Sequence, residues 1–295
     1  MSSLPAMAQD DGVSSEDSNL GCLLQDGRIL GLFRESDHQF SNFISPMTNP
    51  IYFEDPRTLT EARGIFINHH LPNSLGGDNV QVYATQLRAA LTENLSIIAT
   101  KDGYIDSQSP VLSDGFADVM AGLKYNLFKD AETQSILSTG LTYELPVGST
   151  RALQGRGDGE FHLFLTGGTE FLPNWHWVSG SGFRLPANMA AGNQMWYWSN
   201  HVDRKLGDLP FYLFTEANWY HYMSNGTAFP APIGGLDLFN FGSPGIAGND
   251  VVTGAWGLKY KPNKHVEAGI AYEIPLSSRR DIIQDRLTVD LILRF

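Results

Sequence analysis

Hydrophobic and polar residues alternate along much of this chain with a period of two, the pattern of a β-strand that has one apolar and one polar face. The clearest case is the segment 286–295, whose apolar positions include Leu287, Val289, Leu291, Leu293 and Phe295. Arginine, threonine and aspartate fill most of the positions between them. This strand is the last of the chain, so we expect its apolar face to be covered from outside the chain.

The same alternation recurs upstream and predicts a protein built from about twelve strands. In residues 115–128, for example, alanine, valine, leucine and tyrosine on one face oppose aspartate, lysine and asparagine on the other. A period of two argues against helices here, because helical faces repeat every three to four residues. The predicted strands span about residues 62–71, 79–91, 95–102, 115–128, 133–145, 160–171, 175–185, 194–206, 211–223, 250–261, 264–274 and 286–295.

The connections between these strands alternate in length. Short turns are predicted at residues 92–94, 129–132, 173–174, 207–210 and 262–263. Longer loops are predicted at residues 72–78, 103–114, 146–159, 186–193, 224–249 and 275–285. An even strand number, with short periplasmic turns and long extracellular loops, is typical of outer-membrane barrels. We therefore predict an all-β protein in which residues 58–295 form a transmembrane antiparallel β-barrel.

Composition narrows the function classes. The net charge of −12 argues against a nucleic-acid partner, because phosphate backbones are bound by clusters of lysine and arginine. No run of about 18 apolar residues occurs, which excludes a transmembrane helix. The single cysteine, Cys22, permits neither an internal disulfide nor a thiolate metal site. We predict no cofactor and no metal.

The tryptophans all fall in or beside predicted strands. Amphipathic aromatic rings favour the headgroup region, and outer-membrane barrels carry girdles of them at both interfaces. The aromatic girdle candidates are Trp175, Trp177, Trp196, Trp198, Trp219 and Trp256. The alternative is that these rings belong to the core of a soluble β-sandwich, which would have to divide the predicted strands between two sheets.

If the apolar faces contact lipid, the polar faces line the barrel interior. The lumen-lining candidates are Arg88, Asp118, Lys124, Glu144, His162, Glu170, His176, Arg184, His201, Asp203, Glu216, Asn218, Tyr220, Glu267, Glu273, Arg286 and Asp290. Barrels of eight strands are filled by side chains and those of sixteen hold a water channel. About twelve strands therefore predict a narrow polar pore, or one closed by the N-terminal segment. The acidic excess favours cations or neutral solutes over anions.

Residues 1–57 lack the alternation. Residues 6–8 (Ala-Met-Ala) resemble a signal cleavage site, so we interpret the start of the chain as a signal remnant or a truncated signal, followed by an acidic stretch predicted to be disordered. The aromatic, proline-containing stretch up to residue 57 either folds into the lumen as a plug or lies beneath the barrel as a periplasmic cap. Residues 58–61 (TLTE) fit a capping box, so either a short helix or a plain linker precedes the first strand.

Candidates for chemistry are few, and we predict no catalytic residues. Ser199, His201 and Asp203 share one strand face. Neighbours on such a face lie about 7 Å apart, whereas a nucleophile and its base need about 3 Å. His69 and His70 point to opposite faces of a strand and so do not form a metal pair. No glycine-rich phosphate loop or zinc-ligand spacing occurs in the sequence.

Two stretches resemble a known family. GFADVMAGLKYNLF (residues 115–128) and LSTGLTYELPVGS (residues 137–149), with the final alternating strand, are similar to the outer-membrane barrel family labelled for the meta-pathway of phenol degradation. The resemblance is most specific over about residues 115–150 and extends loosely over 60–295. It implies a barrel in the outer membrane of a Gram-negative-type bacterium that admits hydrophobic or aromatic compounds. The final strand also resembles the signal read by the outer-membrane insertion machinery, carried here by Leu287, Val289, Leu291, Leu293 and Phe295.

Three functions are compatible with this sequence. The preferred one is a channel or transporter for passive uptake or efflux of small, hydrophobic or aromatic molecules, with the loop 224–249 controlling access. The second is a structural or adhesive barrel without flux. The third is an outer-membrane lipid hydrolase that would use Ser199 and His201. The expected partners are outer-membrane lipid, the insertion machinery and a small-molecule solute.

Overall fold

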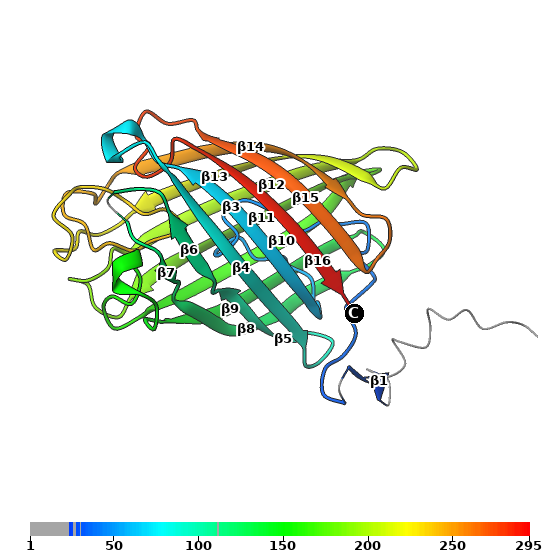
Figure 1. Ribbon diagram of the computed structural model, residues 1–295. Coiled ribbons are helices and arrows are strands. Elements are labelled where there is room, and N and C mark those ends of the chain that lie inside the picture. Colours follow the sequence, from blue (N-terminus) through cyan, green and yellow to red (C-terminus); the bar gives the residue numbers. More distant parts are fainter. Residues whose placement is uncertain (1–23, 26–27, 30, 111) are drawn as a thin grey trace, which may run out of the picture.

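The computed structural model describes residues 24–25, 28–29, 31–110 and 112–295. Within them, twelve antiparallel strands close into one β-barrel (Figure 1). Two barrel strands are broken, so that β5 and β6 together form one of them and β7 and β8 form the next. In chain order the barrel contains β3 (Glu61–His70), β4 (Asn79–Ala90), β5 (Leu95–Lys101), β6 (Tyr104–Ser107), β7 (Gly115–Phe116), β8 (Val119–Asp130), β9 (Ser135–Leu145), β10 (Glu160–Leu172), β11 (Trp175–Pro186), β12 (Met195–Lys205), β13 (Phe211–Tyr222), β14 (Asp250–Tyr260), β15 (Val266–Pro275) and β16 (Asp285–Arg294).

The barrel closes where its last strand meets its first. β16 runs antiparallel to β3 along its whole length, from the pair Asp285 and His70 to the pair Arg294 and Glu61. β3 pairs on its other side with β4, so the sheet returns to its starting strand. A closed wall exposes no backbone edge to hydrocarbon, which is the condition for a sheet to cross a bilayer.

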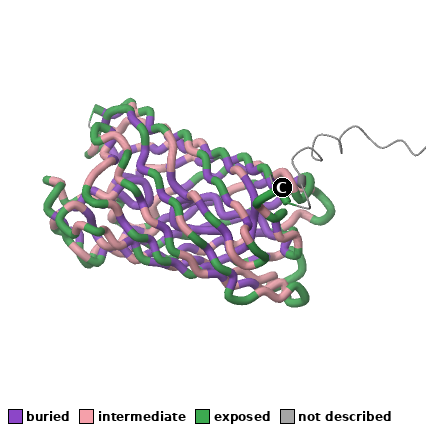
Figure 2. Tube along the Cα trace, turned by 90° about the horizontal axis from the view of Figure 1, so that it is seen from below, coloured by how far each residue is buried: buried purple, intermediate pink, exposed green. Residues whose placement is uncertain are grey.

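Burial alternates along the strands as the sequence pattern predicts (Figure 2). On β16, Leu291 is 51% exposed on the outer face, whereas only 2% of Asp290 and 0% of Ile292 are exposed. Large apolar side chains are exposed around the outer wall, among them Leu87, Leu123, Leu141, Leu163, Leu213, Ile270 and Leu293. A soluble sandwich would bury these side chains, so that alternative is wrong, and the outer face suits lipid.

The two ends of the barrel differ. Short turns such as 173–174 join strands at one end, whereas longer connections, including 146–159 and 223–249, extend the other. The longer connections also hold two short helical turns, η1 (Asn73–Leu75) and η2 (Thr150–Ala152). Among the described residues, no helix is long and apolar enough to cross a bilayer.

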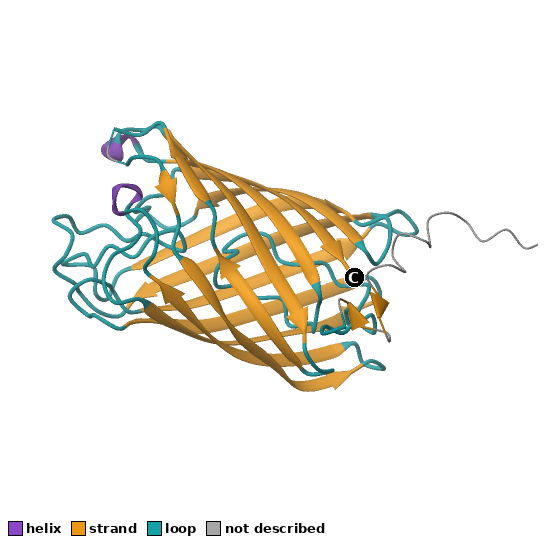
Figure 3. Ribbon diagram, turned by 60° about the horizontal axis from the view of Figure 1, so that its bottom comes forward, coloured by secondary structure: helices purple, strands orange, loops and turns teal. Residues whose placement is uncertain are grey.

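Residues 34–60 enter the barrel at the end with the short turns and run inside it as an irregular chain (Figure 3). We term them the luminal segment. Every residue from 43 to 60 is buried. A two-stranded hairpin, β1 (Leu24–Gln25) and β2 (Arg28–Ile29), precedes this segment outside the barrel (Figure 1). The predicted signal remnant and acidic stretch lie outside the described residues.

The predicted loop after residue 102 begins later than expected, because the strand resumes as β6 after a break at Asp102 and Gly103. Gly103 has a φ of +114°, which strands do not normally contain. The carboxylate of Asp102 accepts a hydrogen bond from the main-chain N–H of Thr85 at 2.7 Å. This contact takes the place of a main-chain hydrogen bond between the two strands. The next strand is interrupted at residues 117–118, between β7 and β8.

The predicted short helix at residues 58–61 does not form, and the linker alternative describes this stretch. The hydroxyl group of Thr58, expected to cap the helix, is hydrogen-bonded to Asn126 of β8. The carboxylate of Glu61, its expected partner, forms ion pairs with Arg88 and Arg294. Both side chains that would have capped a helix are therefore bound to the wall.

Candidate functional site

The lumen-lining candidates are buried, except for Glu170, which is half-buried near the turn 173–174. Several other charged residues of the inner wall are also buried but are not among the candidates, notably Arg63, Lys259 and Arg294. They lie on the polar face of their strands, so the alternation itself could have identified them. Lys259 contacts Asp290 at 3.1 Å, and Arg63 contacts the same carboxylate at 2.8 Å.

Wall side chains bind the backbone of the luminal segment at successive residues. Glu267 accepts a hydrogen bond from the main-chain N–H of Ser45 (2.9 Å), and Glu216 accepts those of Met47 and Thr48 (2.8 and 2.6 Å). Main-chain carbonyls of the segment accept hydrogen bonds from wall donors, in the pairs Pro46 with Arg63, Pro50 with Gln86, Tyr52 with Tyr197, Glu54 with Thr166, Asp55 with Lys124, and Pro56 with Asn126 and Ser138. Buried peptide groups outside secondary structure need such partners. The wall is therefore complementary to the path of this segment.

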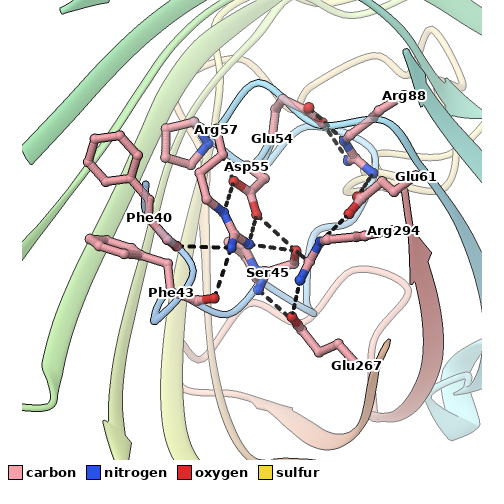
Figure 4. A network of polar contacts seen from close by, with 12 residues as sticks. Phe40, Phe43, Ser45, Glu54, Asp55, Arg57, Glu61, Arg88, Glu267 and Arg294 are labelled. Carbon is pink, nitrogen blue, oxygen red and sulfur yellow. Dashed lines mark hydrogen bonds and ion pairs between the residues drawn. The ribbon is translucent and has the colours of Figure 1, made fainter. Parts of the chain in front are cut away.

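A cluster of buried charges connects the segment to the wall (Figure 4). Arg57 pairs with Asp55 at 2.6 Å and donates a hydrogen bond to the carbonyl of Phe43 at 2.9 Å. Arg294 donates a hydrogen bond to the hydroxyl of Ser45 at 2.7 Å and pairs with two wall glutamates. Buried ions are stable when they are paired and hydrogen-bonded. Here one ion pair lies within the segment and the others within the wall, and the hydrogen bond from Arg294 to Ser45 joins the two groups.

Glu54 of the luminal segment joins two wall cations. Its carboxylate lies 2.6 Å from Nη2 of Arg88 and 2.8 Å from Nζ of Lys124. Burial alone would raise the pKa of Glu54, but the two cations outweigh burial and lower that pKa to about 2. The carboxyl group is therefore ionised at neutral pH, and the wall neutralises its charge.

Ser199, His201 and Asp203 lie on the inner face of β12 and are buried. Nε2 of His201 is 3.2 Å from the carboxylate of Asp203, so the expectation that neighbours on this face stay out of reach is wrong for this pair. The two side chains lean toward each other along the strand. The hydroxyl of Ser199 instead accepts a hydrogen bond from Asn49 of the luminal segment at 2.9 Å. These residues therefore act as wall partners of the segment and of one another.

Near the long loops, the lumen has an apolar region beside β3, β4 and β6, which the two-residue alternation does not predict. Ile65 and Ile67 of β3, Val82 of β4 and Ile105 of β6 are buried in one cluster there. Barrel interiors are normally polar. The signal in the sequence was a short loss of alternation, because Phe66 between the two isoleucines makes both faces of β3 apolar at that level.

Two parts of the chain fill this apolar region. Ile51 and Tyr52 enter it from the luminal segment, and the loop 223–249 contributes Leu236, Leu238, Phe239, Phe241 and Ile246. The loop is held by an ion pair between Asp237 and Arg286 of β16 at 2.8 Å. The space left beside Ile51 is a cavity of about 30 Å³, enough for one or two water molecules.

The tryptophans lie on the outer wall. Trp177, Trp198, Trp219 and Trp256 are exposed, and Trp175 and Trp196 are half-buried. Trp175 begins β11 beside a short turn, and Trp196 lies near the opposite end of the barrel on β12. Trp256 pairs with Thr215 and Tyr272 near the middle of β14. Aromatic girdles lie at the two membrane interfaces, near the strand ends, so Trp256 is not at the depth of a girdle. In the predicted insertion signal, Val289, Leu291 and Leu293 are exposed, and Leu287 and Phe295 are half-buried.

Comparisons with known proteins bear on the fold. No family model and no curated protein matches the sequence. The crystal structure of the COG4313 outer membrane channel from Pseudomonas putida F1 aligns over 86% of this chain and 100% of that chain, with a TM-score of 0.57 and 11% identity. The NanC porin aligns over 80% of this chain and 98% of its own, with a TM-score of 0.52 and 8% identity. Likeness at such low identity shows the fold alone, and the resemblance to the phenol meta-pathway family stays a prediction.

The closed wall of twelve strands and its apolar outer face, together with these likenesses in fold, define a β-barrel of the outer-membrane type. Barrels of this architecture cross the outer membrane of Gram-negative bacteria, with short turns toward the periplasm and long loops outside. The luminal segment therefore enters from the periplasmic end, and the loop 223–249 enters from the extracellular end.

Proposed function

We propose that this protein is an outer-membrane channel for small molecules and that the luminal segment closes it. The observation that carries the proposal is the complementarity between the inner wall and the segment. Polar wall residues such as Glu216 and Lys124 bind the backbone of residues 47–55. Without the segment, the same side chains would face a lumen wide enough for water, because a barrel of about twelve strands is not filled by its own side chains.

The solute that fits this lumen best is small and apolar or aromatic, and it crosses passively. An apolar region toward the extracellular end of the lumen is lined by Ile65, Ile67, Val82 and Ile105. Such a surface attracts apolar molecules because it removes their surface from water. The ion pairs that Glu54 makes with Arg88 and Lys124 become accessible only when the segment moves. A solute needs no net charge to pass the apolar region or the paired charges.

A structural or adhesive barrel without flux is the second candidate. The filled lumen favours it, because the cavity that remains beside Ile51 has a volume of only about 30 Å³. The two candidates differ in what happens when the segment is removed. A lipid hydrolase has no comparable support, since the hydroxyl of Ser199 is bound to Asn49.

Liposome swelling with a small neutral sugar tests the proposal. Full-length protein and a variant without residues 1–57 are compared, and heat-modifiable migration on a gel shows that both are folded. The proposal predicts swelling for the shortened protein and little for the full chain. Swelling by neither protein would favour the structural barrel. Equal swelling by both would show that the segment does not close the channel.

A further inference from the structure

Tyr52 of the luminal segment occupies a recess in the inner wall. Its ring stacks on Tyr197 with centroids 5.7 Å apart and meets His162 edge-on at 5.0 Å. The guanidinium carbon of Arg184 lies 6.0 Å from the centre of the same ring. The phenolic hydroxyl donates a hydrogen bond to Glu160 at 3.0 Å, and Nη1 of Arg184 lies 3.5 Å from the hydroxyl oxygen. We term these four wall residues the Tyr52 recess.

The recess is held by contacts that do not involve the side chain of Tyr52. Nε2 of His162 is 2.9 Å from the hydroxyl of Tyr197. The loop 223–249 fixes the two charged members, through the carbonyl of Phe239 for Arg184 (3.1 Å) and the amide of Asn240 for Glu160 (2.6 Å). All four wall residues are buried. The recess therefore keeps its shape and its polar groups if the ring of Tyr52 leaves.

The polar groups of the recess select one kind of ligand. Glu160 offers a hydrogen-bond acceptor and Arg184 a donor, and both face the hydroxyl group of Tyr52. A neutral hydroxyl group can donate to the first and accept from the second. A carboxylate there would be repelled by Glu160, and an ammonium group by Arg184. A ring without a hydroxyl group would leave Oε1 of Glu160 without its donor, which is costly in a buried site. The stacked and edge-on neighbours favour an aromatic ring over an aliphatic one.

We propose that the Tyr52 recess is a binding site for a small neutral aromatic molecule with one hydroxyl group, and that Tyr52 is a tethered occupant which such a molecule displaces. Because Tyr52 belongs to the luminal segment, displacement removes one of the contacts that keep the segment in place. This second step rests on the proposed function, since it assumes that the segment closes the channel. Binding at the recess does not depend on that assumption.

A tethered occupant competes at a high effective concentration, of about millimolar order for a short link. Free ligand therefore binds the wild-type protein weakly, and vacating the recess reveals the affinity of the site. The probe is 4-methylphenol, the small-molecule equivalent of the tyrosine side chain. Calorimetry on the full-length protein in detergent measures its binding. In Tyr52→Ala we expect binding at least about tenfold tighter than in the wild type.

Phe53→Ala is the matched control. Phe53 is the next residue of the segment and is equally buried, but it packs in an apolar cluster with Phe40, Phe43, Ile136 and Val178. Both variants open a buried space of similar size. The Tyr52→Ala protein should bind 4-methylphenol about tenfold more tightly than toluene and should not bind 4-methylbenzoate. The Phe53→Ala protein should show no preference for the hydroxyl group.

Two further variants keep the test decisive if Tyr52→Ala does not fold. Tyr52→Phe keeps the ring but removes the hydroxyl group that donates to Oε1 of Glu160. This variant should bind 4-methylphenol several-fold more tightly than the wild type. Adding Glu160→Leu to either variant removes the acceptor and should reduce the preference over toluene. The proposal is overturned if neither Tyr52 variant binds more tightly than the wild type, or if Phe53→Ala shows the same preference. Calorimetry involves no flux, so a failure in liposome swelling contradicts the proposed function alone.

Discussion

The carboxylate of Glu54 in the luminal segment lies 2.6 Å from the guanidinium of Arg88 on β4, and their side chains are only 1% and 2% exposed. One partner belongs to the segment and the other to the wall. Removing one partner of such a buried pair costs about 3–5 kcal/mol, because the remaining ion is left uncompensated. Withdrawal of the segment therefore requires water to enter and solvate both groups.

Replacing Glu54 should loosen the segment. In Glu54→Gln, the cations Arg88 and Lys124 lose their shared counter-ion, and we expect the seated segment to lose about 3 kcal/mol of stability. Limited proteolysis of the folded protein checks this, since cleavage within residues 40–57 should become faster. Single-channel recordings should show openings that the wild type lacks.

The matched control is Glu93→Gln. Glu93 also pairs with an arginine, Arg34, at 3.1 Å, but on the surface, with side chains 72% and 44% exposed. Exposed pairs contribute about 0–1 kcal/mol, so this variant should behave as the wild type. Equal protease sensitivity of the two variants would contradict the role assigned to Glu54.

Acid should release the segment only at low pH. The pKa of Glu54 is about 2 when the segment is seated, against an ordinary value of 4.5. A carboxyl group whose pKa is lowered in the folded state stabilises that state fully above its ordinary pKa, and this contribution is lost as the pH falls through the lowered value. Conductance in planar bilayers should therefore stay low from pH 7 to about pH 4 and rise below about pH 3. An opening transition centred between pH 5 and 6 would point to a different group.

Ion selectivity should be weak once the segment is removed. The net charge of −12 alone favours cations. The wall carboxylates, however, are matched by buried cations, which include Arg63, Arg88, Lys124, Lys259 and Arg294. Reversal potentials of the shortened protein in a salt gradient should show at most a modest cation preference. A clear preference for chloride would contradict this account of the lumen.

The break between β5 and β6 depends on glycine. A Cβ at Gly103 would lie 2.3 Å from the carbonyl oxygen of Tyr83, and its φ of +114° is strained for other residues. Gly103→Ala should destabilise the barrel by about 1–3 kcal/mol. The denaturant midpoint of heat-modifiable migration measures this. Gly64→Ala is the control, because a Cβ there meets only a carbonyl oxygen at 4.0 Å, and it should leave the midpoint unchanged.

The wall could be predicted from the sequence because one local rule sets it. Lipid outside and polar groups inside impose the two-residue period, so strands such as β16 and β10 appear at their observed positions within a few residues. The same rule placed Glu216 and Lys124 on the inner face. It could not place Ile65 and Ile67, which depart from the rule because loop and segment cover them inside the barrel.

The path of the luminal segment could not be predicted, because no period governs it. Its prolines interrupt regular structure, and its partners lie far along the chain, as for Thr48 and Glu216, which are 168 residues apart. Complementarity of this kind exists only once the barrel has closed. The contact between His201 and Asp203 could not be predicted for a related reason. Strand spacing fixes the positions of the backbone but not the directions of the side chains.

The central claim is that residues 43–58 lie inside the barrel wall in the membrane, and cross-linking tests it most directly. In a Cys22→Ser background, Asn49→Cys is combined with Ser199→Cys, whose side chains are in contact at 2.9 Å in the native pair. The control pair uses Trp198→Cys, the adjacent residue on the lipid face. A short bifunctional thiol reagent is applied to outer membranes, and gel migration and mass spectrometry detect the product. The account predicts a cross-link from residue 49 to residue 199 and none to residue 198. Cross-linking to neither position, or equally to both, would contradict it.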